Sequence, residues 1–206
     1  LNMDLVVDVE HLPLVGETVL GNQYWKSPGG KGANQAYAAG RAGADVAMLG
    51  CVGEDRYGTT MLEKLTEAGV RKDAVRREKQ HPTGTAFVLR ETSGANSIIV
   101  ISGANWRCTP AYLAEYRDYF AWADCVLCQL EIPLESVCAA VHQAKELGKT
   151  VLLNPAPACP DLPGSLFPQI DVITPNETEL AALTGGPTGT LEEIADHFYV
   201  SKSYLS

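Results

Sequence analysis

One stretch decides how the rest of the chain is interpreted: SPGGKGAN at residues 27–34, which runs directly into the alanine-rich QAYAAGRA at residues 35–42. Glycine has no Cβ, so these glycines let a ligand approach the backbone closely. Alanine favours helix, which predicts one over residues 34–43. A turn that leads into a helix offers N–H donors and a positive dipole end to a polyhydroxylated or anionic small molecule, and the Asn34 amide adds a donor and an acceptor. The alternative is a helix N-terminus with a flexible lead-in.

Two common phosphate-binding patterns are absent from this stretch. The GxxxxGK[ST] loop needs Ser or Thr after its lysine, but Gly32 follows Lys31, and Trp25 stands where the first glycine belongs. The dinucleotide fingerprint GxGxxG needs a third glycine where this chain has Gln35. The glycines therefore predict a different kind of small-molecule site.

The composition describes a globular protein and disfavours some function classes. The chain has 206 residues, of which 46% are hydrophobic and 20% charged, enough for one domain with or without a small appendage. Its net charge of −9 disfavours a nucleic-acid surface. No apolar run reaches the roughly 18 residues of a membrane span, and no signal peptide opens the chain, although the first residue is Leu. We expect a cytoplasmic protein with neither a membrane nor a nucleic-acid partner.

Six cysteines lie mostly among aliphatic residues: Cys51, Cys108, Cys125, Cys128, Cys138 and Cys159. Cys125 and Cys128 have the CxxC spacing of redox and zinc sites, but no second Cys/His pair follows at zinc spacing. Val126 and Leu127 between them favour a buried strand. Reduced thiols are therefore expected.

Hydrophobic periodicity predicts the elements of the first half of the chain. The predicted strands are residues 3–9, 17–25, 44–53, 84–90 and 97–102, and the predicted helices are residues 34–43 and 57–68. The first two strands are expected to pair across a turn, and the last two to form a hairpin.

From residue 109 onward, predicted strands and helices alternate. Thr109 and Pro110 have the residue types of an N-cap and a first helical position. The predicted helices are residues 111–122, 133–147 and one from 177, and the predicted strands are residues 125–130, 150–153 and 172–174. This alternation implies a mostly parallel α/β sheet covered on both faces. Sites in such sheets form beyond the carboxyl ends of strands, which marks Glu131, Asn154 and residues 176–179 as well as the glycine stretch.

Seven blocks resemble, in order and spacing, the ribokinase-like (PfkB-type) family of carbohydrate kinases. They are NMD at 2–4, LPLVGETVLG at 12–21, GGKGANQA at 29–36, GCVGED at 50–55, QLEIPLES at 129–136, LNPAPA at 153–158 and ITPNETE at 173–179. The resemblance covers residues 1–188 and implies a Rossmann-like α/β core with a small β-lid near residues 3–26 and 84–102. It further implies transfer of the ATP γ-phosphate to the 5-hydroxyl of D-ribose, with Mg²⁺, with K⁺ bound outside these residues, and in a homodimer joined through the lid.

The resemblance also assigns roles to individual residues. The implied sugar-binding residues are Asn2, Asp4, Gly30, Lys31, Gly32, Ala33, Asn34 and Glu131. A carboxylate such as Asp4 can accept from two neighbouring hydroxyls at once. Asn176 and Glu179 would lie near the nucleotide phosphates and the outer shell of hydrated Mg²⁺, with no direct metal ligand in this chain.

These polar residues have structural interpretations too. Asp4 could be an acid at a strand end, Lys31 a solvated surface lysine, and Glu131 a cap for the helix that follows it. Asn176 and Glu179 would then form an ordinary helix N-terminus, with acids at the positive end of the dipole.

The family's Gly-Ala-Gly-Asp-type motif does not occur in the 206 residues, so the general-base Asp is expected outside this chain. The ATP-base pocket, the cation loop and the strand before Asn2 are also missing relative to the family. We therefore expect a truncated, inactive chain that binds sugar weakly. Residues 189–206 diverge, and residues 191–206 resemble the start of an AraC-type helix-turn-helix, interpreted as a junction or truncation, a fusion, or chance. The alternative functions are a sugar-sensing regulator with a DNA-binding tail and a sister kinase for another sugar or nucleoside.

Overall fold

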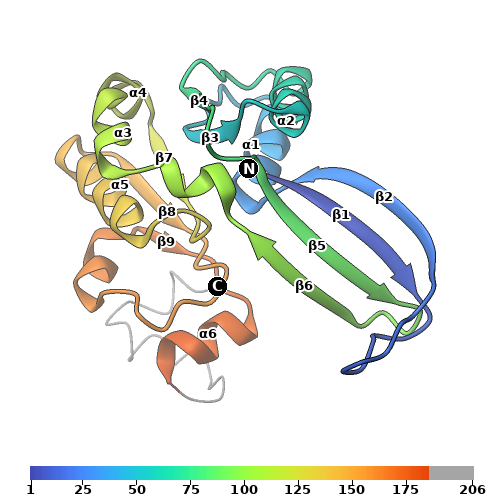
Figure 1. Cartoon of the computed structure of the whole chain (residues 1–206). Coiled ribbons are helices and arrows are strands. Elements are labelled where there is room, and N and C mark those ends of the chain that lie inside the picture. The colour runs from blue at the N-terminus through green and yellow to red at the C-terminus, as the bar shows by residue number, and fades with distance from the viewer. Residues whose placement is uncertain (186–206) are drawn as a thin grey trace. The chain divides into compact units, whose positions relative to one another are not determined.

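The computed structural model describes residues 1–185, and the chain divides after Cys108 into two compact units. The elements of the first unit are β1 (Asn2–Val9), β2 (Gly21–Gly29), α1 (Lys31–Arg41), β3 (Gly50–Gly53), α2 (Arg56–Glu67), β4 (Val75–Glu78), β5 (Gly84–Glu91), β6 (Asn96–Ile101) and the 3₁₀ helix η1 (Gly103–Arg107) (Figure 1). The predicted domain boundary at residue 188 and the stretch that resembles a helix-turn-helix lie outside the described residues.

Four strands of the first unit form one sheet, in the order β2-β1-β5-β6, at the positions predicted for the lid. β1 pairs antiparallel with β2 and parallel with β5, and β5 forms the predicted hairpin with β6. Figure 1 shows these strands extending as a long arm beyond α1 and α2. β2 begins later than predicted because a turn comes first: Glu17 N–H donates to Leu14 O at 3.0 Å, and Gly16 has φ 81°.

The core of the first unit lies between α1, α2 and the starts of the strands. Met61 and Leu65 of α2 are 1% exposed and pack in one cluster with Met3, Val52 and Val75. The strand predicted over residues 44–53 is shorter: β3 pairs in parallel with β4, and before it Ala47 forms only an isolated parallel bridge with Arg71. β4 was missed because its sequence, VRRE, has no apolar alternation.

Asp55 joins the start of α2 to the start of β5. Its Oδ1 accepts from Gly58 N–H at 2.8 Å and from the Thr83 hydroxyl at 2.7 Å, and its Oδ2 accepts from Thr83 N–H at 2.8 Å. Thr83 is 1% exposed, and its hydroxyl oxygen accepts from Gly53 N–H at 2.9 Å. Burial alone would raise the pKa of Asp55, but the hydrogen bonds donated by Gly58 and Thr83 outweigh it and lower that pKa.

We expect Asp55→Asn to lower the free energy of unfolding by about 2 kcal/mol at neutral pH, since one amide oxygen cannot replace two carboxylate oxygens. Because folding lowers this pKa, the stabilisation is complete above the ordinary value of 3.8 and is lost as the pH falls through the folded value. Urea unfolding at a series of pH values measures the difference in unfolding free energy between variant and parent, and this difference should become smaller in acid. If the difference did not depend on pH, the ionised Asp55 carboxylate would not be the source of the stabilisation. Asp45→Asn, in an exposed pair with Arg71, is the control.

The second unit has α3 (Pro110–Glu115), α4 (Arg117–Trp122), β7 (Cys125–Cys128), α5 (Leu134–Glu146), β8 (Thr150–Leu153), the 3₁₀ helix η2 (Gly164–Gln169), β9 (Val172–Ile173) and α6 (Glu177–Thr184). Strands β7, β8 and β9 form the parallel sheet that the alternation predicted. α5 packs against β7 and β8 and contacts α3 and α4.

The helix predicted over residues 111–122 is two helices. Thr109 caps the first as expected, accepting from Tyr112 N–H at 3.3 Å. Tyr116 leaves the helical region with φ −112° and ψ 29°, while its ring contacts those of Tyr112 and Tyr119. The break therefore coincides with an aromatic cluster that helix periodicity does not reveal.

Cys125 and Cys128 lie in β7, so the predicted strand is present, but it is not buried throughout: Cys125 and Leu127 are exposed, whereas Cys128 is buried. Burial raises the pKa of the Cys128 thiol to about 12, which disfavours the reactive thiolate at neutral pH. Within residues 1–185, every helix is too short or insufficiently apolar to cross a bilayer, and no group of three His, Cys, Asp or Glu side chains is placed to hold a metal ion. The cytoplasmic location stays a prediction.

Candidate functional site

The glycine stretch turns at Gly30. Gly29 ends β2, Gly30 is the N-cap of α1, and the helix begins at Lys31, earlier than predicted. Gly30 has φ 87°, and a Cβ there would lie 2.8 Å from the backbone nitrogen of Asn2. The turn therefore needs glycine for its dihedral angles and for its close packing.

The first turn of α1 carries no acid, and no side chain caps it. Asn34 N–H donates to Gly30 O at 2.9 Å, so the helical hydrogen bonds begin there. The N–H groups of Gly32 and Ala33 have no acceptor within the helix and lie at the positive end of its dipole. This helix start can therefore donate hydrogen bonds to a ligand.

Asn2 and Asp4 lie on one face of β1, because strand residues two apart share a face. Each side chain occupies the space above a glycine of a neighbouring strand. A Cβ at Gly29 of β2 would lie 2.2 Å from Asp4 Oδ2, and a Cβ at Gly84 of β5 would lie 2.2 Å from Asn2 Oδ1. The structure thus brings Asn2, Asp4 and the glycine turn together.

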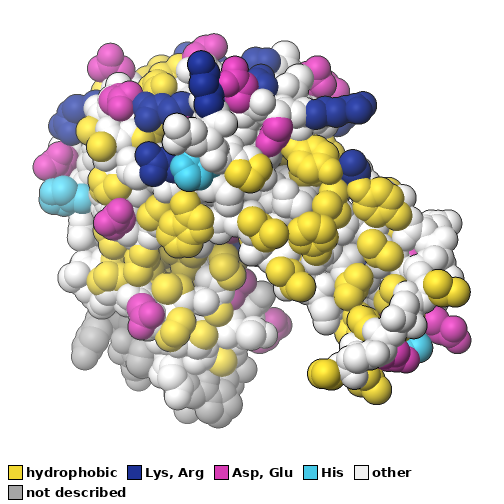
Figure 2. All heavy atoms as spheres, viewed as in Figure 1, with side chains coloured by type: hydrophobic (Ala, Val, Ile, Leu, Met, Phe, Trp, Pro, Cys, Tyr) yellow, Lys and Arg dark blue, Asp and Glu magenta, His cyan; other side chains and the backbone are white. Residues whose placement is uncertain are grey.

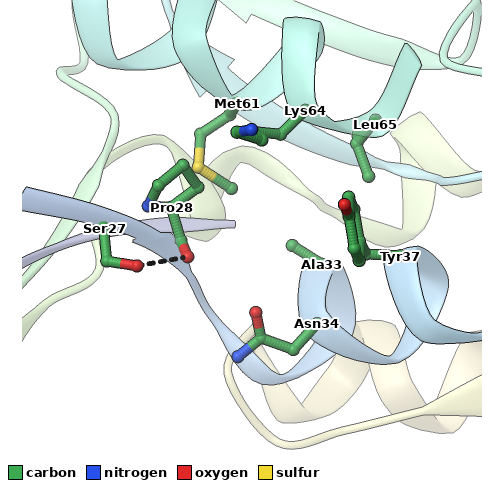
Figure 3. A pocket seen from close by; sticks show the side chains of 8 residues that line it. All are labelled: Ser27, Pro28, Ala33, Asn34, Tyr37, Met61, Lys64 and Leu65. Carbon is green, nitrogen blue, oxygen red and sulfur yellow. Dashed lines mark hydrogen bonds between the residues drawn. The ribbon is translucent and has the colours of Figure 1, made fainter. Parts of the chain in front are cut away.

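A cavity of about 300 Å³ lies beside the first turn of α1 (Figure 3). Its lining residues are Ser27, Pro28, Ala33, Asn34, Tyr37, Met61, Lys64 and Leu65. Met61 and Leu65 also belong to the cluster that contains Met3, whereas Asp4 projects from the opposite face of β1. Of the predicted sugar-binding residues, this cavity therefore includes only Ala33 and Asn34. It is an opening next to the glycine turn, on the core side of the sheet.

In the second unit, polar residues follow the carboxyl ends of β7, β8 and β9. Asn154 ties these ends together: its N–H donates to Cys128 O and its Nδ2 donates to Thr174 O, both at 2.9 Å. Glu131 is half-buried in the loop between β7 and α5, where Pro133 is the N-cap residue. The polar residues that follow the three parallel strands therefore lie at one edge of this sheet, as the α/β pattern predicted.

Asn176 and Glu179 form a reciprocal capping box at the start of α6. Asn176 Oδ1 accepts from Glu179 N–H at 2.8 Å, and Glu179 Oε2 accepts from Asn176 N–H at 3.0 Å. Asn176 Nδ2 also donates to Glu179 Oε1 at 3.1 Å, and Glu179 is 7% exposed. These contacts are those of an ordinary helix N-terminus, which is the alternative interpretation given above for Asn176 and Glu179. An ionised carboxylate has about four acceptor positions, and the box uses one on each oxygen of Glu179.

Sequence reasoning missed two residues that contact Asn2. Gly84 has a local signal, since glycine within a β-rich run often marks a close approach. Asn105 has none: its Nδ2 donates to Asn2 Oδ1 at 2.7 Å, across 103 residues of chain.

Comparison with known proteins decides the family. The family model described as pfkB family carbohydrate kinase matches residues 1–200. The chain belongs to this family. The match enters the stretch that resembles a helix-turn-helix, whose nature stays a prediction.

Two bacterial ribokinases illustrate the family relationship. The chain is 43% identical over 185 residues to ribokinase of Haemophilus influenzae, covering 90% of this chain and 60% of that protein. It is also 43% identical over 205 residues to ribokinase of Bacillus subtilis, covering 100% of this chain and 68% of that protein. The chain thus spans about 60% of the length of the first of these relatives.

A solved structure of Arabidopsis thaliana ribokinase, complexed with ribose and ATP, matches with a TM-score of 0.85 at 36% identity. The match covers 96% of this chain and 64% of that one. The predicted fold class, parallel strands flanked by helices with a small additional sheet, is therefore confirmed.

Proposed function

We propose that this chain binds D-ribose and belongs to a kinase that transfers the ATP γ-phosphate to the sugar's 5-hydroxyl. One observation carries the proposal: the Asp4 carboxylate lies against the glycine turn, in a chain 43% identical to ribokinases. The carboxylate suits a vicinal diol, and the start of α1 offers N–H donors to sugar oxygens. The expectation of an inactive chain and the two alternative functions are not borne out by the comparisons.

The proposed sugar-binding residues remain Asn2, Asp4, Gly30, Lys31, Gly32, Ala33, Asn34 and Glu131. These groups bind and orient the sugar, and none of them is proposed as the base that takes the hydroxyl proton. Asn176 and Glu179 are proposed to face the nucleotide phosphates and hydrated Mg²⁺. Carboxylate chemistry fits that role because Mg²⁺ keeps several of its waters, which donate to oxygen acceptors. Mg²⁺ would neutralise charge on the phosphates during transfer.

The test is a panel of sugars and nucleosides. D-ribose at about 100 times its dissociation constant should stabilise the protein by about 2.7 kcal/mol and raise its melting temperature by roughly 5 °C. 2-Deoxyribose, fructose 6-phosphate and adenosine are the matched ligands, and smaller shifts are expected for all three. ADP formation from ATP, measured with the whole kinase to which this chain is proposed to belong, should require ribose. A larger shift with any of the three would reject ribose as the substrate, and ribose binding by the whole protein without ADP formation would favour the regulator.

We also propose that the lid joins two copies of the chain. Its edge strand β6 carries Ile98, Ile99, Val100 and Ile101, which are 51–65% exposed, and Figure 2 shows hydrophobic side chains gathered on the projecting sheet. Uncovered apolar edge strands favour association. The strand pairing places some of these apolar residues on the same face as the proposed sugar site. Ala86 of β5 pairs with Asp4 of β1 on one side and with Val100 of β6 on the other, so the three side chains share one face of the sheet.

Ile99→Asp should weaken this dimer at least about tenfold, because it places a charge in an apolar contact. Sedimentation velocity across a concentration series measures the effect. Ile99 pairs with Phe87 and Leu5 on the face opposite Asp4, so ribose affinity should stay within about twofold of the parent. Thr92→Asp, in the exposed turn of the same hairpin, is the matched control. A parent protein that stays monomeric throughout would reject the lid dimer.

A further inference from the structure

Asn105 of η1 is held by the backbone of the residue that precedes β1. Its Oδ1 accepts from the terminal amino group of Leu1 at 3.1 Å, and its Nδ2 donates to Leu1 O at 3.2 Å. The Asn105 side-chain amide thus makes one accepted and one donated hydrogen bond with the backbone, as a peptide group of a neighbouring strand would. Because these two bonds need oxygen at one end and nitrogen at the other, they fix which end of the amide is which.

The orientation of Asn105 sets that of Asn2. Asn105 Nδ2 also donates to Asn2 Oδ1 at 2.7 Å, so the carbonyl oxygen of Asn2 must face Asn105 and its NH₂ group must face away. Both side chains are 2% exposed, so bulk water cannot substitute for this bond. Gly84 makes the contact possible: a Cβ there would lie 2.2 Å from Asn2 Oδ1 and 2.4 Å from Asn105 Nδ2.

We propose that Asn105 is a positioning residue of the sugar site, which acts by holding the carbonyl oxygen of Asn2 and so turning the NH₂ group of Asn2 away from Asn105. This inference rests on the proposed function. The ionised Asp4 carboxylate can only accept hydrogen bonds, whereas the oriented Asn2 donates. A sugar hydroxyl both donates and accepts, so a donor beside an acceptor on one strand face recognises it. With the Asn2 amide reversed, the face would present acceptors alone.

A double-mutant cycle separates positioning from general stabilisation. Asn105→Ala should raise the dissociation constant for D-ribose about five- to tenfold in the parent, but less than about twofold when Asn2→Ala is already present. Isothermal calorimetry below the melting transitions of all variants measures both steps. Equal increases in the two backgrounds, or no increase in the parent, would overturn the positioning role. Thr83→Val, also buried and adjacent to Gly84, is the control: it should lower stability and leave ribose affinity unchanged.

A sugar-free measurement keeps this result separate from the proposed function. In the ¹⁵N,¹³C-labelled parent, a scalar coupling through the hydrogen bond should join the Asn105 side-chain nitrogen to the Asn2 side-chain carbonyl carbon. Asn105→Asp should move the Asn2 NH₂ signals, because that amide then turns to donate to the new carboxylate. A missing coupling overturns the orientation whether or not sugar binds. A coupling in a protein that binds no ribose rejects the proposed function, and the positioning role with it.

Discussion

Asp4→Asn should weaken D-ribose binding about 100-fold and leave the free energy of unfolding within about 0.5 kcal/mol of the parent. The amide keeps the shape of the carboxylate above Gly29 but loses the charge and one acceptor oxygen. Hydrogen bonds from hydroxyls to a charged acceptor contribute about 1.5–3 kcal/mol each, and 100-fold corresponds to about 2.7 kcal/mol. Calorimetric titration with D-ribose measures the dissociation constant, and urea unfolding measures the stability.

The matched control lies on the same strand. Asp8 accepts from Arg90 Nε at 2.7 Å and Arg90 Nη2 at 3.1 Å, and the hydrogen bond from Arg90 lowers the pKa of Asp8. Asp8→Asn breaks this exposed pair further along β1, so ribose affinity should change less than about twofold. Equal losses in the two variants would indicate damage to β1 rather than a lost hydroxyl acceptor. An unchanged affinity in Asp4→Asn would remove Asp4 from the site.

Local signals predicted the elements that depend on local chemistry. Pro133 and Gly148 bracket the helix predicted over residues 133–147, and α5 spans Leu134–Glu146, with Gly148 at φ 69°. The strand predicted over residues 150–153 is β8. In both cases the residues that begin or end the element lie next to it in sequence, so periodicity and capping rules suffice.

Features that depend on distant partners escaped prediction. β4 is a strand because β3 lies beside it, and nothing within VRRE indicates that pairing. The blocks of family resemblance singled out Asn2 and Asp4, but the glycines that make room for their side chains lie on β2 and β5. Likewise, the orientation of the Asn2 amide depends on Asn105, and a single sequence contains no pattern that links them.

Gly30→Ala should lower the free energy of unfolding by about 3 kcal/mol and abolish measurable ribose binding. Two costs add. Alanine is strained at φ 87° and ψ 134°, and its Cβ would lie 2.8 Å from the backbone nitrogen of Asn2. That contact is with backbone, so it is relieved only if β1 or the glycine turn shifts. Either shift separates the start of α1 from Asp4. Urea unfolding and calorimetric titration with D-ribose measure the two effects.

Gly43→Ala measures the cost of backbone strain at a positive φ angle by itself. Gly43 has φ 94°, and a Cβ there would meet nothing within 4 Å, so its substitution adds backbone strain without a clash. We expect about 1–2 kcal/mol of destabilisation and no change in ribose affinity. The excess cost of Gly30→Ala then measures how tightly the glycine turn packs on β1. If the two variants lost equal stability and both kept the parent's affinity, close packing at Gly30 would contribute nothing to the sugar site, and glycine there would serve only the turn.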